Sequence, residues 1–225
     1  MEESKIKIIL VDDHPVVRQG IAKYLENEGD IEICGEAETA NDAIKIIDET
    51  NPHLAIIDIS LKGGIDGIEL IKAVKNRFPN VLTLCLSMFE ESVYAERAIR
   101  AGAKGYIQKN MEPDTIVKAI HRIMEGKLYL NEDIADKIIS KMMHGGSPKK
   151  GSEQMDNLSN REFEVFLHIG NGSNTREIAK IMNLSTHTIE SHRKNIKDKL
   201  MLADMGELNK TAIQWVLTHN KKTDD

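Results

Sequence analysis

The first 126 residues repeat one pattern five times: a short apolar run is followed by a segment whose apolar residues return at helical spacing. Strands of a parallel sheet that is covered on both faces read as continuous apolar runs, whereas the helices between them show a period of 3.6 residues. The pattern therefore predicts an α/β domain at residues 1–126 with a doubly wound, five-stranded parallel sheet. The five predicted strands are Ile6–Val11, Ile31–Ala37, His53–Ile57, Val81–Cys85 and Lys104–Gln108.

The middle of the chain, residues 127–155, loses this pattern and is predicted to be a linker. It begins with a short helical spacing of apolar residues (Ile134, Ile138, Met142). It then becomes rich in Gly, Ser, Pro and Lys at 144–152, a composition typical of a flexible tether.

Residues 156–220 are predicted to form a second, small all-α domain of four helices, followed by a polar tail at 221–225. Three helix starts have the sequence of a capping box: Ser159-x-x-Glu162, Asn174-x-x-Glu177 and Asp204-x-x-Glu207. Ser185 or Thr186 begins a further helix that extends to about Leu200. Because the short connection before it contains Asn183 and Leu184, the middle two helices are predicted to form a helix-turn-helix.

Composition and charge exclude several classes of protein. The apolar runs are far shorter than the roughly 20 residues of a membrane-spanning helix, the acidic N-terminus does not resemble a signal peptide, and two lone cysteines, Cys34 and Cys85, fit a reducing compartment. Residues 1–126 carry 15 basic against 22 acidic residues, whereas Arg176–Lys199 carries 6 basic against 3 acidic residues. We therefore expect a cytoplasmic protein, without a membrane partner, whose front domain is acidic and whose back domain has a local positive patch.

Reactive side chains stand at the carboxyl ends of the predicted strands. They are Asp12 and Asp13 after the first strand, Asp58 after the third, Ser87 after the fourth and Lys109 after the fifth. Ligands of a doubly wound sheet bind at this edge. Three converging carboxylates repel one another unless a cation lies among them, and Mg²⁺ is the hard cation that such oxygen ligands favour. With a hydroxyl and an ammonium group added, the set predicts phosphoryl transfer to a carboxylate.

Residues 5–125 resemble the receiver domain of response regulators, in the subclass that begins Val11-Asp12-Asp13-His14-Pro15. The resemblance implies a flavodoxin-like fold with strand order 2-1-3-4-5. It also implies that Asp58 is the phosphorylated nucleophile and that Mg²⁺ is held by Asp12, Asp13, Asp58 and the backbone carbonyl of Ser60. Ser87 and Lys109 would then bind the phosphoryl group, with Tyr106 as an aromatic switch that turns inward. The loop after Asp58 departs from the common pattern, since Lys62 replaces a proline and one residue is added.

Residues Leu158–Val216 resemble the LuxR-type helix-turn-helix of the NarL/FixJ regulators. The matching stretches include Leu158-Ser-Asn-Arg-Glu162, Glu177-Ile-Ala179 and Lys199-Leu200. A helix with one apolar and one basic face fits the major groove of double-stranded DNA. By position, Glu190, Ser191 and Lys194 are the expected base readers, and His192 is expected to pack inward. The expected phosphate contacts are Thr186, His187, Thr188, Arg193 and Lys197.

The leading hypothesis is a two-component response regulator that is not an enzyme beyond its own phosphorylation and dephosphorylation. A sensor histidine kinase would phosphorylate Asp58, and the phosphorylated protein would bind DNA as a homodimer. Two alternatives remain open: a phosphatase that uses the carboxylate and Mg²⁺ site, and a constitutive DNA-binding or protein-binding regulator whose front domain serves only for dimerisation.

Overall fold

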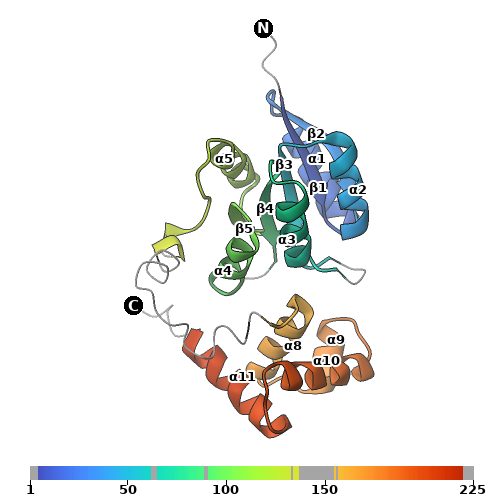
Figure 1. Cartoon of the computed structure of the whole chain (residues 1–225), viewed down its shortest axis with the longest axis vertical. Helices are drawn as coiled ribbons and strands as arrows, with labels where there is room; N and C mark the ends of the chain where they lie inside the picture. The colour runs from blue at the N-terminus through green and yellow to red at the C-terminus, as the bar shows by residue number, and fades with distance from the viewer. Residues whose placement is uncertain are drawn as a thin grey trace. The chain divides into compact units, whose positions relative to one another are not determined.

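The computed structural model divides into two compact units, residues 1–145 and 146–225 (Figure 1). It describes residues 5–61, 65–88, 91–132, 134–136, 155 and 157–219. The predicted tether at 144–152, the tail at 221–225, Lys62, Ile138 and Met142 lie outside the described residues. No helix in the described part of the chain is long and apolar enough to cross a bilayer.

The first unit contains a parallel sheet with the strand order β2-β1-β3-β4-β5, which confirms the predicted topology. The strands are β1 (Ile6–Val11), β2 (Ile31–Ala37), β3 (Leu54–Asp58), β4 (Leu82–Ser87) and β5 (Gly105–Gln108). The first two strands match their predicted bounds. The predicted bounds of the other three were wrong by one or two residues at their ends.

The difference has a physical cause at the carboxyl ends of β3 and β4. The prediction ended the third strand at Ile57 and the fourth at Cys85, but Asp58 still pairs with Leu86, and Leu86 and Ser87 still pair with β5. Asp58 and Ser87 are therefore the last residues of their strands rather than the first residues of loops. Their backbones are fixed by the sheet.

Two layers of helices cover the sheet (Figure 1). The helices α1 (Pro15–Leu25) and α5 (Pro113–Met124) contact each other, whereas α2 (Ala40–Thr50), α3 (Gly67–Arg77) and α4 (Glu91–Ala101) form a second row. Alternation along β1 separates the two layers: Ile8 and Leu10 belong to the core shared with α1 and α5. The intervening Ile9 and Val11 are also buried and face the other layer, because successive strand residues point to opposite faces.

The start of α3 presses directly against the end of β3. Asp66 caps the helix, since its carboxylate accepts a hydrogen bond from the Glu69 amide at 3.0 Å. A Cβ atom at Gly67 would lie 2.0 Å from the backbone oxygen of Asp58. Glycine at this position therefore permits the close approach that holds the backbone around Asp58.

The segment after α5 pairs with the edge of the sheet. Tyr129 bridges to Gly105: its amide donates to the Lys104 carbonyl at 2.9 Å, and its carbonyl accepts from the Tyr106 amide at 3.0 Å. The amide of Asn131 donates to the carboxylate of Glu91 at 2.7 Å. This edge segment, residues 128–131, thus contacts both β5 and the start of α4.

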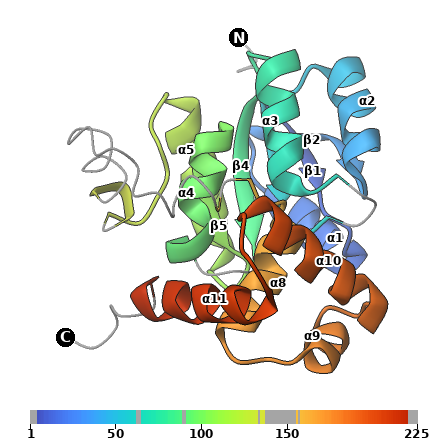
Figure 2. The ribbon, with the colours of Figure 1, turned by 60° about the horizontal axis from the view of Figure 1, so that its bottom comes forward.

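The second unit consists, in its described part, of α8 (Asn160–Gly170), α9 (Thr175–Ile181), α10 (Thr186–Lys199) and α11 (Met205–His219) (Figure 2). The predicted capping boxes at Ser159/Glu162 and Asn174/Glu177 are confirmed. At the third, Asp204 caps the Glu207 amide as predicted, but the Glu207 carboxylate accepts from the Ala203 amide, one residue before the cap. The rings of Phe163, Phe166 and Trp215 pack together and join α8 to α11.

Candidate functional site

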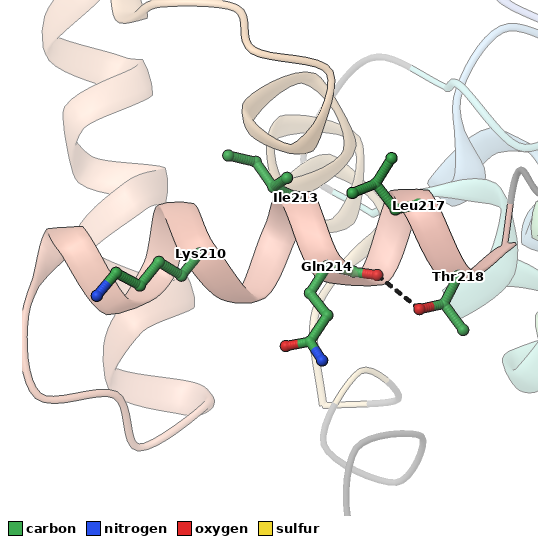
Figure 3. Close-up of a pocket in the computed structure, with 5 residues that line it drawn as sticks. All are labelled: Lys210, Ile213, Gln214, Leu217 and Thr218. Carbon is green, nitrogen blue, oxygen red and sulfur yellow. Dashed lines mark hydrogen bonds between the residues drawn. The ribbon is translucent and has the colours of Figure 1, made fainter.

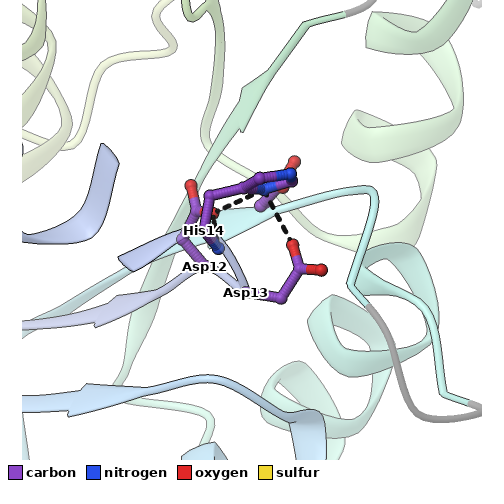
Figure 4. A group of neighbouring side chains, drawn as sticks. Asp12, Asp13 and His14 are labelled. Carbon is purple, nitrogen blue, oxygen red and sulfur yellow. Dashed lines mark hydrogen bonds and ion pairs between the residues drawn. The ribbon is translucent and has the colours of Figure 1, made fainter. Parts of the chain in front are cut away.

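The acidic site of the first unit lies at the carboxyl end of the sheet. Asp12 and Asp13 directly follow β1, and Asp58 ends the neighbouring strand β3. The three side chains are nearly buried, with 6%, 5% and 2% of their surface exposed. One ligand atom from each of Asp12, Asp13, His14 and Asp58 lies within 4.8 Å of the others, close enough to share one metal ion. Figure 4 shows Asp12, Asp13 and His14 of this cluster.

Lys109 brings a positive charge to two of these carboxylates. It follows β5, and its amide donates to the carbonyl of Ser87 at 2.7 Å, which fixes its backbone beside β4. Its Nζ lies 2.7 Å from Oδ2 of Asp58 and 2.7 Å from Oδ2 of Asp12. The structure therefore brings together four of the residues that the strand ends predicted as one site.

Burial and charge act in opposite directions on this group. Burial raises the pKa of Asp58 above its ordinary value, and the nearby Lys109 opposes that rise without cancelling it. Burial by itself would lower the pKa of Lys109, but the Asp58 and Asp12 carboxylates outweigh burial, so the pKa of Lys109 is raised. The lysine is therefore a fixed positive charge at physiological pH.

Ser60 contacts Asp58 through its backbone. Its amide donates a hydrogen bond to Oδ1 of Asp58 at 3.1 Å. Asp58 is thus oriented through both oxygens, Oδ1 by Ser60 and Oδ2 by Lys109. The expected role of the Ser60 carbonyl toward a metal remains a prediction.

Ser87 and Tyr106 form a buried pair on adjacent strands. Their side chains have a hydrogen bond between them, and the two residues are 0% and 1% exposed. Burial, followed by the neighbouring Cys85, raises the pKa of the Tyr106 hydroxyl, so the phenol stays neutral. Tyr106 therefore points into the first unit, and its role as an aromatic switch stays a prediction.

The sequence reasoning missed Arg18. This buried side chain on α1 donates to the backbone oxygen of Asp12 at 2.7 Å and pairs with Glu36 at 2.8 Å and Glu38 at 3.0 Å. The sequence offered one indication of this role. Arg18 is a basic residue among the apolar positions of a predicted helix, and that helix follows a strand that ends in carboxylates. His14 was also left without a role, although it stands next to both aspartates.

In the second unit, α10 buries Ile189 and Ile196 and turns a polar face outward. The exposed residues among the predicted DNA contacts are Thr186, His187, Glu190, Ser191 and Lys194. Thr188, Arg193 and Lys197 are half-buried. The Arg193 guanidinium donates to the Asn209 side chain of α11 at 2.9 Å. Lys194 is therefore the basic residue of α10 that is most openly displayed within this predicted set.

Two further contacts fix the pose of α10. The Ser185 hydroxyl caps its start by accepting from the Thr188 amide at 3.0 Å. At its end, Lys199 contacts the buried carboxylate of Glu162 on α8 at 2.6 Å. The role of Glu162 as an anchor was not anticipated, because its capping-box position already accounted for a glutamate.

His192 is half-buried, and burial lowers its pKa, which agrees with the expected inward packing.

Comparisons with known proteins match both units. A model of the response regulator receiver domain matches residues 8–121, and one of bacterial regulatory proteins of the luxR family matches residues 156–211. The chain is 33% identical to the uncharacterised transcriptional regulatory protein YhcZ of Bacillus subtilis, over 94% of this chain and 97% of that protein. It is 32% identical to the response regulator protein VraR of Staphylococcus epidermidis, over 96% and 98% of the two chains.

Among solved structures, the chain is similar to RcsB from Salmonella enterica serovar Typhimurium, bound to the promoter rprA with the phosphomimetic BeF3⁻. The identity is 28%, the coverage is 93% of this chain and 99% of that one, and the TM-score is 0.57. A second RcsB structure, with 28% identity, coverage of 92% and 98% and a TM-score of 0.56, holds two RcsB dimers on two parallel DNAs.

Proposed function

The chain belongs to the response regulators that join a receiver domain to a DNA-binding domain of the luxR family, and on this premise we propose that phosphorylation of Asp58 controls its binding to DNA. Members of this family are DNA-binding regulators of transcription. The observation that carries the proposal is the position of Asp58, whose carboxylate ends a central strand within 2.7 Å of Lys109 and beside Asp12 and Asp13.

In the proposed reaction, an Asp58 oxygen attacks the phosphorus of a phosphohistidine on a sensor histidine kinase. A P–O bond to Asp58 forms, the P–N bond to the histidine breaks, and the histidine leaves with its electron pair and takes up a proton. The Lys109 ammonium favours the ionised Asp58 carboxylate and orients it, and burial shields the carboxylate from bulk water while raising its pKa. The receiver's own chemistry is limited to this phosphorylation and its hydrolysis.

The residues present fit a hard divalent cation. Three nearly buried carboxylates within reach of one another need cationic charge among them, and carboxylate oxygens are the ligands that Mg²⁺ prefers. Asp12, Asp13, Asp58 and the Ser60 carbonyl would hold it. When bound, Mg²⁺ would neutralise the charge that develops on the phosphoryl oxygens.

The expected response to phosphorylation runs through Ser87 and Tyr106. Both side chains are buried and hydrogen-bonded, and Ser87 ends the strand next to Asp58. The new negative charge would hold Ser87 and Lys109 at the phosphoryl group and Tyr106 inward. It would thereby bias α4, which begins at Glu91, toward one of two arrangements.

DNA binding is proposed for the outer face of α10. Glu190, Ser191 and Lys194 would read bases in the major groove. The proposed phosphate contacts are Thr186, His187, Thr188, Arg193 and Lys197. The Ser185 cap and the Glu162–Lys199 contact support this role, because they hold the helix rigidly on its scaffold. The proposed domains are residues 1–126 and 156–220, with a linker at 127–155 whose edge segment, residues 128–131, pairs with β5.

A homodimer is proposed for the phosphorylated form, as in the RcsB dimers on DNA. One face of α11 carries a pocket lined by Lys210, Ile213, Gln214, Leu217 and Thr218 (Figure 3). Ile213 and Leu217 are 43% and 57% exposed. A second copy of α11, related by a two-fold axis, would bury both side chains against the same residues.

The proposed location is the cytoplasm. DNA is accessible there, and the free cysteines Cys34 and Cys85 stay reduced.

The test is intact mass and solution size after incubation with Mg²⁺ and acetyl phosphate. The proposal predicts one added phosphoryl group and a shift to dimer, both absent from Asp58→Ala. Absence of the adduct with acetyl phosphate and also with a histidine kinase would exclude the phosphorylation mechanism. Continuous release of phosphate over many turnovers would favour the phosphatase.

A further inference from the structure

His14 directs its imidazole at the two aspartates that precede it. Its Nδ1 lies 2.9 Å from Oδ1 of Asp13 and 3.3 Å from Oδ1 of Asp12 (Figure 4). Its backbone amide also donates to Oδ1 of Asp12 at 2.8 Å. His14 is the cap residue of α1, but its side chain makes no capping hydrogen bond. The imidazole is therefore turned toward the carboxylates instead of toward the helix.

The atoms that face His14 differ from those that face Lys109. Lys109 contacts Oδ2 of Asp12 and Oδ2 of Asp58, whereas His14 contacts Oδ1 of Asp12 and Oδ1 of Asp13. A cation could bind on the His14 side while the Lys109 ion pairs persist. The His14 side chain is 55% exposed, so that side is accessible to an ion from solution.

We propose that Nδ1 of His14 is a nitrogen ligand that lets this metal site take divalent transition ions, such as Ni²⁺, Co²⁺ or Zn²⁺, in competition with Mg²⁺. The inference rests on the metal site of the proposed function and adds to it a second class of ion. Imidazole suits Zn, Ni and Cu, whereas Mg²⁺ favours oxygen ligands and keeps several waters. Oδ1 of Asp12, Oδ1 of Asp13 and Nδ1 of His14 would form a mixed oxygen and nitrogen set on three consecutive residues.

The identity of residue 14 therefore determines which ions the site accepts. With His14 present, a divalent ion late in the first transition row, such as Ni²⁺, gains a nitrogen ligand that Mg²⁺ does not need. Without it, the remaining carboxylates still suit Mg²⁺. Loss of the imidazole is thus expected to lower the affinity for Ni²⁺ and to leave the affinity for Mg²⁺ near its wild-type value.

The test is calorimetric titration of the untagged full-length protein with NiCl2 and, separately, with MgCl2. His14→Ala removes the imidazole, and His14→Gln keeps a neutral side chain that can still donate a hydrogen bond to the carboxylates. His121→Ala is the matched control, because His121 is also partly exposed and paired with an aspartate, Asp30, at 2.8 Å. We expect both His14 variants to lose about tenfold or more in Ni²⁺ affinity. We expect their Mg²⁺ affinity, and both affinities of His121→Ala, to stay near wild type.

Equal losses for Ni²⁺ and Mg²⁺ would overturn the proposal, because His14 would then only position the carboxylates. Unchanged Ni²⁺ affinity in His14→Ala, or no Ni²⁺ binding by wild type, would overturn it as well. Failure of wild type to bind Mg²⁺ is a different result: it contradicts the magnesium site of the proposed function, while a Ni²⁺ affinity that depends on His14 would still support the nitrogen ligand.

Discussion

The ammonium group of Lys109 lies 2.7 Å from the carboxylate of Asp58, although 51 residues separate them in sequence. The sheet brings them together, because β4 lies between β3 and β5 and the Lys109 amide is bonded to the Ser87 carbonyl at the end of β4. The relationship fixes the position of the proposed phosphoacceptor, and the ammonium opposes the rise that burial causes in the pKa of Asp58.

Lys109→Met should destabilise the first unit, because it leaves the buried carboxylates of Asp58 and Asp12 without this cation. Removal of one partner of a buried ion pair costs about 3 kcal/mol. Urea denaturation at pH 7 measures the loss. Lys127→Met is the control: its ion pair with Glu125 is exposed to solvent, so the free energy of unfolding should stay near that of wild type. A Lys109 variant as stable as the control would contradict the structural role of the pair.

Asp58→Asn should be more stable than wild type at neutral pH. Burial raises the pKa of Asp58 in the folded protein, so the folded state holds this proton more tightly than the unfolded chain does. Below the carboxyl pKa of the unfolded chain, about 3.9, Asp58 is protonated in both states and its ionisation does not affect stability. Above the raised pKa of the folded protein, Asp58 is ionised in both states and the full cost of the buried charge applies. The advantage of Asp58→Asn should therefore disappear as the pH falls to about 4. Denaturation of both proteins across this range checks it, and an advantage that grows at low pH would contradict the raised pKa.

Gly105→Ala should detach the edge segment at residues 128–131. The added Cβ would lie 2.9 Å from the Tyr129 oxygen and 3.0 Å from Leu84 Cδ1, and such overpacking costs about 1 to 3 kcal/mol. Hydrogen exchange should become faster at the Tyr106 and Tyr129 amides. Gly20→Ala, on an open face of α1 with no atom near the added Cβ, should instead stabilise by about 0.5 to 1 kcal/mol. Unchanged exchange in Gly105→Ala would show that the segment does not depend on this contact.

Glu162→Ala should loosen α10 from α8. Glu162 accepts hydrogen bonds from the Ser159 amide and from Lys199, and loss of a hydrogen bond to a charged group costs about 2 kcal/mol. Glu177→Ala, which removes a capping-box glutamate from the exposed start of α9, should cost about 1 kcal/mol. Thermal unfolding of the second unit within the full chain compares the two. Similar losses would mean that the Lys199 contact adds little.

Lys194→Ala should lose preference at one base position, because Lys194 is proposed to read a base. A uniform loss of affinity for all double-stranded sequences, with the salt slope reduced by about 1, would indicate a phosphate contact and would contradict the proposed role. Binding titrations at several salt concentrations separate the two outcomes. Lys45→Ala, an exposed lysine of α2 paired with Asp42, should change neither.

Periodicity was enough to predict the parallel sheet and the edge where Asp12, Asp13, Asp58, Ser87 and Lys109 meet, whereas the strand order followed only from the resemblance to receiver domains. A strand with both faces buried must be apolar throughout, and its carboxyl end is where polar residues resume. The predicted ends of β3 and β4 were too early: Asp58 and Ser87 continue the ladders through their backbones, and the apolar Leu86 was also left out of β4.

Contacts that depend on side-chain direction were not predictable from the pattern. Nothing in the spacing indicates that Arg18 reaches the carbonyl of Asp12, that His14 turns toward Asp13, or that Tyr129 joins the edge of β5. Each involves a side chain or backbone group whose partner is set by tertiary packing. These contacts surround the residues that the sequence did identify.

The most direct test of the central claim is the DNA affinity of the full chain with and without acetyl phosphate and Mg²⁺. The probe is a double-stranded fragment that the phosphorylated protein selects from sheared genomic DNA. We predict that wild type binds this fragment more tightly once phosphorylated, and that Asp58→Ala binds it weakly under both conditions. Equal affinity of phosphorylated wild type and Asp58→Ala would contradict the account and favour constitutive DNA binding.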